Sequence, residues 1–274
     1  MNRRTFLKRS FFLGTSLLVA SYPFFIERYL VQINRYRIPV PNLPKEFTDF
    51  RILHLTDLHF GFLVPELLIQ HVIEKANNIN KDIVVCTGDY IHERKITDHI
   101  EQVWSLIAKL KAKSGVYSVL GNHDHGDNFD RSLYWIEKSG QNLRHRAKPI
   151  EHDGARIWIG GAGDLWKDEP GIDNAFHNVP DNDCKILLAH NPDTADTSFD
   201  ARVDLMISGH THGGQVNIPL YGPPVLPVRN KRYSSGYIKS EKTNLFISKG
   251  IGWAVIPVRF NCTPEIAILE LQPA

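Results

Sequence analysis

Five short clusters of histidine, aspartate and asparagine in the 274-residue sequence could bind a metal ion. Their ligand atoms would be imidazole nitrogens, carboxylate oxygens and amide oxygens, without thiolate. This donor set favours manganese, iron or zinc and disfavours copper(I) and iron–sulfur clusters. The clusters are Asp57-Leu58-His59, Gly88-Asp89, Gly121-Asn122-His123-Asp124, His190-Asn191-Pro192 and Gly209-His210-Thr211-His212.

Each cluster taken alone has an ordinary structural explanation. Asp57 with His59 is compatible with a capping turn, Gly88-Asp89 with a simple turn, and a lone histidine with a core position. Five such clusters, each directly after a short apolar run, favour one shared site over five unrelated turns. Glycines in three of them would let the chain turn sharply and approach a bound group closely.

The apolar runs that precede the clusters are predicted to be buried strands. Runs at 51–56, 82–87 and 116–120 alternate with helical patterns at 65–79 and 97–113, which predicts βαβ units and a parallel or mixed sheet covered on both faces. Because ligands bind outside the carboxyl ends of strands in such sheets, the clusters should converge. Further strands are expected at 156–160, 185–189, 204–208, 245–248 and 265–271.

The ordered set of clusters from Asp57 to His212 resembles the signature of the calcineurin-like binuclear metallophosphoesterases. The resemblance implies an α/β fold of four layers, a mixed β-sheet sandwich flanked by helices, over most of residues 45–274. Four stretches resemble a narrower bacterial subgroup of exported or membrane-associated phosphodiesterases, the YaeI/YkuE type. They are residues 188–193, 209–215, 227–233 and 259–265.

The resemblance also implies roles for individual residues. Two divalent metal ions, most readily Mn, Fe or Zn, would activate a hydroxide that hydrolyses a phosphodiester bond. Asp89 would bridge the two ions, and His123 would protonate or stabilise the leaving oxygen without being a ligand. One ion would be held by Asp57, His59 and His212, and the other by Asn122, His190 and His210.

Five further residues near these motifs have roles that the sequence leaves open. Asp124 would either orient His123 or occupy a surface turn, and His125 would either line the substrate rim or be structural. Arg229, Lys231 and Arg232 would either contact a phosphate or an anionic membrane surface, or simply be solvated.

Residues 1–29 are predicted to be a twin-arginine-type signal peptide or an N-terminal membrane anchor, and residues 30–274 the catalytic domain. Arg3 and Arg4 precede an apolar run at 11–20, which is the architecture of an export signal. The alternative is a buried N-terminal helix. Use of the export machinery would place the protein in the periplasm or cell envelope, with possible anchoring to the inner membrane and membrane contact through the N-terminus.

Composition excludes several classes of protein. Hydrophobic residues make up 42% and charged residues 23%, which excludes a disordered chain and a polytopic membrane protein. Three scattered cysteines do not form a disulfide framework. The net charge of +2 combines 32 basic and 30 acidic residues, and four of the basic ones lie in residues 1–21, which hold no acidic residue. The remaining 28 basic and 30 acidic residues give no sign of specific nucleic-acid binding.

Phosphodiester hydrolysis is the leading functional hypothesis, with a phosphodiester or a nucleotide-linked lipid as substrate. A second hypothesis is a pyrophosphatase of the UDP-2,3-diacylglucosamine type, acting in lipid A synthesis. Apolar residues after the first motif, Phe60, Phe62, Leu63 and Val64, would then lie near a lipid tail. A third hypothesis, from another class, is a non-catalytic binding protein stabilised by metal.

Overall fold

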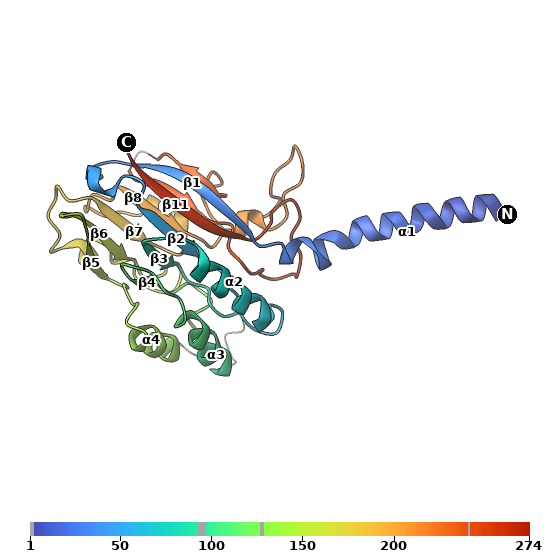
Figure 1. The fold of residues 1–274 in the computed structure, drawn as a ribbon, viewed down its shortest axis with the longest axis horizontal. Coiled ribbons are helices and arrows are strands. Elements are labelled where there is room, and N and C mark those ends of the chain that lie inside the picture. The colour runs from blue at the N-terminus through green and yellow to red at the C-terminus, as the bar shows by residue number, and fades with distance from the viewer. Residues whose placement is uncertain (1–2, 93–96, 127–128, 241) are drawn as a thin grey trace.

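Two mixed β-sheets pack face to face between helical layers in the computed structural model, which describes residues 3–92, 97–126, 129–240 and 242–274 (Figure 1). This arrangement confirms the predicted four-layer α/β sandwich. Residues 1 and 2 of the predicted signal lie outside the described residues.

The first sheet has five strands and the second has six. In spatial order the first sheet comprises β1 (Gln32–Val40), β11 (Glu265–Pro273), β2 (Arg51–Leu55), β3 (Ile83–Cys86) and β4 (Val116–Ser118). The second comprises β5 (Arg146–His152), β6 (Ala155–Gly161), β7 (Lys185–Leu188), β8 (Leu205–Ser208), β10 (Asn244–Ile247) and β9 (Gly236–Ile238). Three pairs are antiparallel, namely β2 with β11, β5 with β6, and β9 with β10.

The hydrophobic core consists of three clusters, because successive side chains along a strand point to opposite faces of its sheet. In β2, Ile52 lies in the cluster between the two sheets, whereas Leu53 and Leu55 lie in the cluster beneath the helices. Those helices are α2 (Glu66–Asn78), α3 (Thr97–Ile107) and α4 (Phe129–Lys138). The outer face of the second sheet packs against α5 (Ile172–Phe176) and the short 3-10 helix η3 (Pro192–Asp196).

The strands predicted from apolar runs are confirmed, but β1, β5, β9, α4 and α5 were not predicted. The strand β1 is polar at alternate positions because one of its faces is exposed at the sheet edge. Its polar side chains still find partners, since Asn34 Nδ2 and Tyr36 Oη both donate to Glu265 Oε2, at 2.6 and 2.8 Å. A search for apolar runs misses a strand of this kind.

The predicted helix 97–113 is too long, because α3 ends at Ile107. Beyond this point the backbone forms hydrogen bonds with a side chain of α2. Asn77 Nδ2 donates to Lys109 O, and Asn77 Oδ1 accepts from the backbone N–H of Lys111, both at 2.9 Å. These bonds satisfy backbone groups that would otherwise continue the helix.

The N-terminal helix α1 (Arg3–Phe25) projects from the domain as a single rod (Figure 1). The predicted alternative of a buried N-terminal helix is therefore wrong. Its 23 residues span about 35 Å, enough for a hydrocarbon core of about 30 Å. Among the described residues, α1 and the turn after it form the one helical segment long and apolar enough to cross a membrane. Whether it is a cleaved signal or an anchor remains a prediction.

Candidate metal centre

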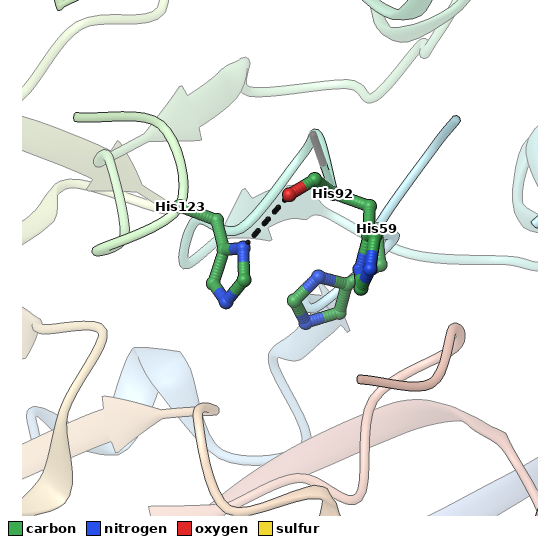
Figure 2. Close-up of side chains that lie close together, drawn as sticks. All are labelled: His59, His92 and His123. Atoms are coloured by element: carbon green, nitrogen blue, oxygen red, sulfur yellow. Dashed lines mark hydrogen bonds between the residues drawn. The ribbon is translucent and has the colours of Figure 1, made fainter. Parts of the chain in front are cut away.

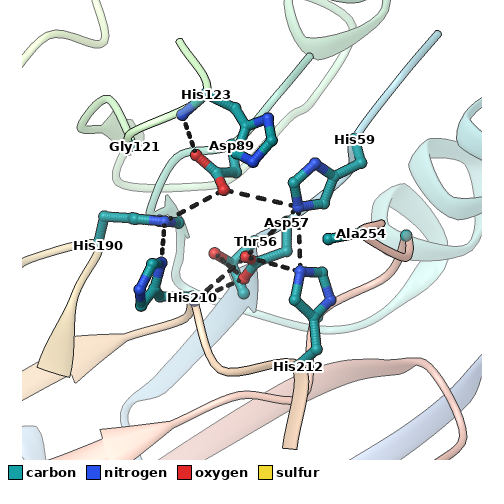
Figure 3. Close-up of polar contacts among 12 residues, drawn as sticks. Thr56, Asp57, His59, Asp89, Gly121, His123, His190, His210, His212 and Ala254 are labelled. Carbon is teal, nitrogen blue, oxygen red and sulfur yellow. Dashed lines mark hydrogen bonds and ion pairs between the residues drawn. The ribbon is translucent and has the colours of Figure 1, made fainter. Parts of the chain in front are cut away.

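The five clusters converge at one end of the sandwich, as their positions after strands predict (Figure 3). Asp57 follows β2, Asp89 follows β3, Asn122 follows β4, His190 follows β7 and His210 follows β8. All seven predicted ligands are buried, each with a relative exposure of 5% or less. The other two of the seven ligands, His59 and His212, lie in the loops after β2 and β8.

Asp57, His59 and His212 form the first group that could hold a metal ion. The Nε2 atoms of His59 and His212 lie 3.0 Å apart. Asp57 Oδ1 is 3.4 Å from His212 Nε2 and 3.9 Å from His59 Nε2. Three donor atoms from two loops, one after β2 and one after β8, thus face one small volume.

Asp89, His190 and His210 form the second group. His190 Nε2 lies 3.1 Å from His210 Nδ1, 3.3 Å from Asp89 Oδ2 and 3.2 Å from Asn122 Oδ1. Asp89 Oδ2 is also 3.5 Å from His59 Nε2 in the first group. The Asp89 carboxylate therefore stands between the two groups (Figure 3).

The donor atoms are spaced as a metal ion requires. Ligands bound at ~2.1 Å from one ion lie ~3.0 Å apart in octahedral sites and ~3.4 Å apart in tetrahedral sites. Two of the histidines also donate the ring N–H that faces away from the site to a backbone carbonyl. His190 Nδ1 donates to Thr87 O at 2.8 Å, and His210 Nε2 donates to Pro227 O at 2.9 Å. Each bond turns the inner nitrogen toward the site, where it can bind an ion once it carries no proton.

The backbone at the site is strained. Five of the seven predicted ligands, Asp57, His59, Asp89, His210 and His212, have left-handed φ values between 47° and 70°. Such conformations cost non-glycine residues roughly 1–3 kcal/mol each and cluster at functional sites. The predicted close approach at glycine is also present, since a Cβ at Gly121 would overlap Asp89 Oδ1.

Burial and neighbouring charge set the protonation of the histidines. Burial lowers the pKa of His59 and His212 well below the usual range and that of His210 to about 3. Burial opposes the charge on His190 too, but Asp89 raises its pKa to about 10. Although burial alone would raise it, His190 and His123 hold the pKa of Asp89 well below its usual range. The site thus combines three neutral imidazoles with an ion pair.

His123 stands beside the two groups, and a residue outside the motifs orients it. Its backbone N–H donates to Asp89 Oδ1 at 2.8 Å. Its ring Nδ1 donates to the backbone carbonyl of His92 at 3.0 Å, as Figure 2 shows. Because a carbonyl only accepts, Nδ1 carries the proton and Nε2 is left for a substrate. The ring of His92 lies 5.7 Å from that of His123 and 5.5 Å from that of His59.

Sequence reasoning missed His92 because it belongs to none of the five clusters. The structure places it with His59 and His123 in a third group whose ring nitrogens could meet at one ion. His92 lies only three residues after Asp89, but no motif residue type or spacing marked it, and the turn after Asp89 is what brings it to the site.

Both alternatives for Asp124 are wrong. Asp124 is buried, and its carboxylate accepts from the backbone N–H groups of Asp89, Tyr90 and Gly121 at 2.7–2.8 Å. It therefore ties the loop after β3 to the loop after β4 instead of orienting His123. His125 is buried as well, with Nδ1 2.8 Å from Gly121 O, which supports the structural reading over a place on the rim.

The buried guanidinium of Arg259 lies next to the first group. Its Nη2 is 3.4 Å from His212 Nδ1 and donates to the carbonyl of Lys249 at 2.9 Å. Burial is the largest cause of the lowered pKa of His212, followed by the neighbouring His59 and then by the charge of Arg259. Arg229, Lys231 and Arg232 are instead exposed, on the segment that leads away from Pro227.

A cavity of about 510 Å³ opens onto the site. Six of the site residues lie at its base, and Trp166, which sequence reasoning missed, packs edge-on against His210 with ring centroids 4.4 Å apart. Five residues form an apolar wall farther out, namely Val216, Pro224, Val225, Val255 and Ile256.

Comparison with known proteins agrees with this geometry. Residues 50–214 match the family described as calcineurin-like phosphoesterase. The chain is 31% identical to the uncharacterized metallophosphoesterase YkuE of Bacillus subtilis, over 99% of this chain and 98% of YkuE. It is 29% identical to phosphodiesterase YaeI of Escherichia coli, over 96% and 98% of the two chains. It is also 28% identical to a transmembrane protein with metallophosphoesterase domain from Danio rerio, over 86% of this chain and 56% of that one.

These matches confirm the resemblance inferred from the motifs, including the narrower subgroup. They also make the chain a hydrolase of phosphoric esters, as predicted. The protein belongs to the calcineurin-like phosphoesterase family.

Proposed function

We propose that the protein hydrolyses phosphodiester bonds at a centre of two divalent cations. The observation that carries this proposal is the position of Asp89. Its Oδ2 atom lies 3.5 Å from His59 Nε2 and 3.3 Å from His190 Nε2. A carboxylate placed between two histidine groups is the arrangement that lets two cations share one ligand.

In this proposal the two groups at the site would each hold one cation. Asp57, His59 and His212 would bind the first, and Asp89 would be shared. His190 and His210 would bind the second together with the amide oxygen of Asn122, which is 3.2 Å from His190 Nε2. The nitrogen and oxygen donors favour manganese, iron or zinc.

The cations, when bound, supply a deprotonated water near neutral pH and offset negative charge on the phosphoryl oxygens. The chain itself supplies the proton for the leaving group. His123 Nδ1 is held by the His92 carbonyl, so an additional proton on this ring resides on Nε2. That proton passes to the leaving oxygen, which is the role of a general acid.

We also propose that α1 acts as an export signal or membrane anchor that places the catalytic domain in the cell envelope. Its length and composition support this, as do the four basic residues among its first seven. The name of the Danio rerio relative, a transmembrane protein, is consistent with a membrane location.

A pyrophosphatase acting on a nucleotide-linked lipid is the second candidate. The apolar outer wall of the cavity favours it, because Val225, Val255 and Ile256 would accommodate an acyl chain better than a sugar or a nucleotide. Both candidates use the same cations and the same His123.

The experiment that tests the proposal uses bis-p-nitrophenyl phosphate as substrate. Protein stripped of metal with a chelator should not hydrolyse it, and manganese or zinc should restore hydrolysis. Thermal unfolding measured on the same samples separates catalysis from a merely structural metal. Full hydrolysis by stripped protein contradicts the proposal. Restored stability without restored hydrolysis of any phosphodiester favours the non-catalytic binding protein.

A further inference from the structure

Exposed apolar side chains gather in two loops at the mouth of the cavity. Beyond residue 33, the described part of the chain has eleven exposed large hydrophobic side chains, and seven lie in the segments 218–225 and 255–260. We call these segments the apolar loops. Leu220 is fully exposed, Val255 is 86% exposed and Tyr221 is 75% exposed. A concentration of this kind on a soluble domain marks an interaction surface.

The apolar loops are bonded to each other and to the end of α1. Asn217 N donates to Phe260 O at 2.8 Å, which joins the base of the first loop to the second. The backbone N–H of Arg259 donates to Pro23 O, in the last turn of α1, at 3.1 Å. In Figure 1 the orange segment between β8 and β9 projects from the domain on the side where α1 leaves it.

The junction between α1 and the domain is held firmly. The Glu27 carboxylate is buried and accepts from the backbone N–H of Cys262 at 2.7 Å. Arg28 Nη1 donates to Pro257 O at 3.2 Å, and its guanidinium lies 4.6 Å from the Trp253 ring. Cys262 Sγ in turn lies 3.2 Å from the carbonyl of His212. Two hydrogen bonds thus connect the turn after α1 to a predicted metal ligand.

Charge next to the apolar loops suits an anionic surface. Arg229, Lys231 and Arg232 are exposed just after the first loop. Lys231 Nζ donates to the carbonyls of Leu226 and Val228, which holds its charge beside the loop. Apolar side chains next to exposed basic residues are the composition of surfaces that bind the headgroup region of anionic bilayers.

We infer that the apolar loops dock into the bilayer that α1 enters, so that the cavity opens at the level of the lipid headgroups. The substrate would then be a phosphodiester carried by a lipid. Its headgroup phosphate would reach the metal centre while its acyl chains lie against Val225, Val255 and Ile256. The substrate class rests on the proposed hydrolysis of phosphodiesters, whereas the docking rests only on the proposed membrane position of α1.

Docking can be measured without any hydrolysis. The full chain with Tyr221→Cys, labelled with bimane, is placed in vesicles of phosphatidylcholine and phosphatidylglycerol. Tyr134→Cys on α4 is the matched control, since Tyr134 is also exposed and α4 lies away from α1 (Figure 1). The native cysteines are buried and should not be labelled. Brominated lipids should quench the Tyr221 label at least about twofold more than the control. Equal quenching at the two positions overturns the inference.

The substrate class needs a second measurement. Vesicles containing phosphatidyl-p-nitrophenol report hydrolysis of a lipid phosphodiester, and bis-p-nitrophenyl phosphate reports hydrolysis in solution. The double variant Leu220→Asn/Tyr221→Ser should lose at least about tenfold on the lipid, because the loops lose two large apolar side chains. It should stay within about twofold of wild type on the soluble substrate, as should Tyr134→Ser on both.

The outcomes of the two measurements distinguish the docking of the apolar loops from the lipid substrate. If the wild type with metal hydrolyses neither substrate, the proposed function fails while bromine quenching still reports docking. If the wild type hydrolyses the soluble substrate but not the lipid, the lipid substrate is rejected. If the double variant loses both activities equally or neither, the role of the apolar loops in presenting the lipid is rejected. If the Tyr221 label is shielded from water but not quenched by brominated lipid, a protein covers the loops and the bilayer docking is rejected.

Discussion

His59 and His212 present their Nε2 atoms to each other across 3.0 Å, in a pocket where both side chains are buried. Burial lowers the pKa of both rings well below the usual range, so both are neutral. Two neutral nitrogens at this distance need either one shared proton or one cation. Asp57 Oδ1 at 3.4 Å from His212 Nε2 adds the negative charge that favours a cation.

His123 and His92 should differ in their effect on turnover. His123→Ala removes the general acid and should lower the turnover number about 10²–10⁴-fold for a phosphodiester with an alkoxide leaving group, with metal content unchanged. The loss should be much smaller for bis-p-nitrophenyl phosphate, because nitrophenolate leaves readily without a proton. His92→Ala keeps the backbone carbonyl that orients His123, so its loss should be below about tenfold. Steady-state kinetics and metal analysis on both variants check this. A larger loss in His92→Ala than in His123→Ala would contradict the assignment of His123 as the general acid.

Cation binding should release a proton. Asp89 raises the pKa of His190 from 6.5 to about 10 in the metal-free protein, despite burial, so His190 is protonated at pH 7. Its ion pair with Asp89 stabilises the metal-free fold fully below pH 6.5, and this contribution is lost as the pH rises through about 10. A cation needs the neutral ring, so its affinity should rise by about tenfold per pH unit near neutrality.

Calorimetric titration with zinc at pH 7, in buffers with different heats of ionisation, measures this release. About one proton per bound cation is expected at the second group. A titration that releases no protons, or an affinity that is constant between pH 6 and 8, rules out the protonated His190.

Asp124 should matter for stability although it faces neither cation nor substrate. Asp124→Asn replaces an acceptor of three backbone N–H groups with an amide that also donates, so at least one N–H loses its partner. The free energy of unfolding should fall by about 2–3 kcal/mol. Urea denaturation checks this, with Asp153→Asn as the control, since Asp153 is exposed in the turn after β5. Equal stability of the two variants would contradict the claim that Asp124 links the loops after β3 and β4.

The convergence of the seven predicted ligands could be foreseen because each follows an apolar run, and the carboxyl ends of such strands meet. The sequence did not indicate His92, whose contribution is a main-chain carbonyl that any residue type could provide. The role of Asp124 was missed for a related reason, since its partners are backbone N–H groups on another loop. The polar edge strand β1 depends on pairing with β11, more than 200 residues away in the sequence.

The three cysteines should be inert to thiol reagents in the folded protein. All are buried, and burial raises the pKa of Cys86 to about 12. Reaction requires the thiolate, which is scarce and inaccessible at pH 8. Ellman's reagent should therefore react with no thiol in native protein within minutes and with all three in urea. Rapid reaction of a native thiol would contradict the packing of the core.

The bridge at Asp89 is the central claim, and counting cations tests it most directly. After loading with manganese or zinc and gel filtration, elemental analysis should find about two cations in each wild-type chain. Asp89→Asn should hold one at most and hydrolyse bis-p-nitrophenyl phosphate at least about 100-fold more slowly. Asp153→Asn, which also changes an aspartate at left-handed φ, should match the wild type. Two cations and normal hydrolysis in Asp89→Asn would contradict the shared carboxylate.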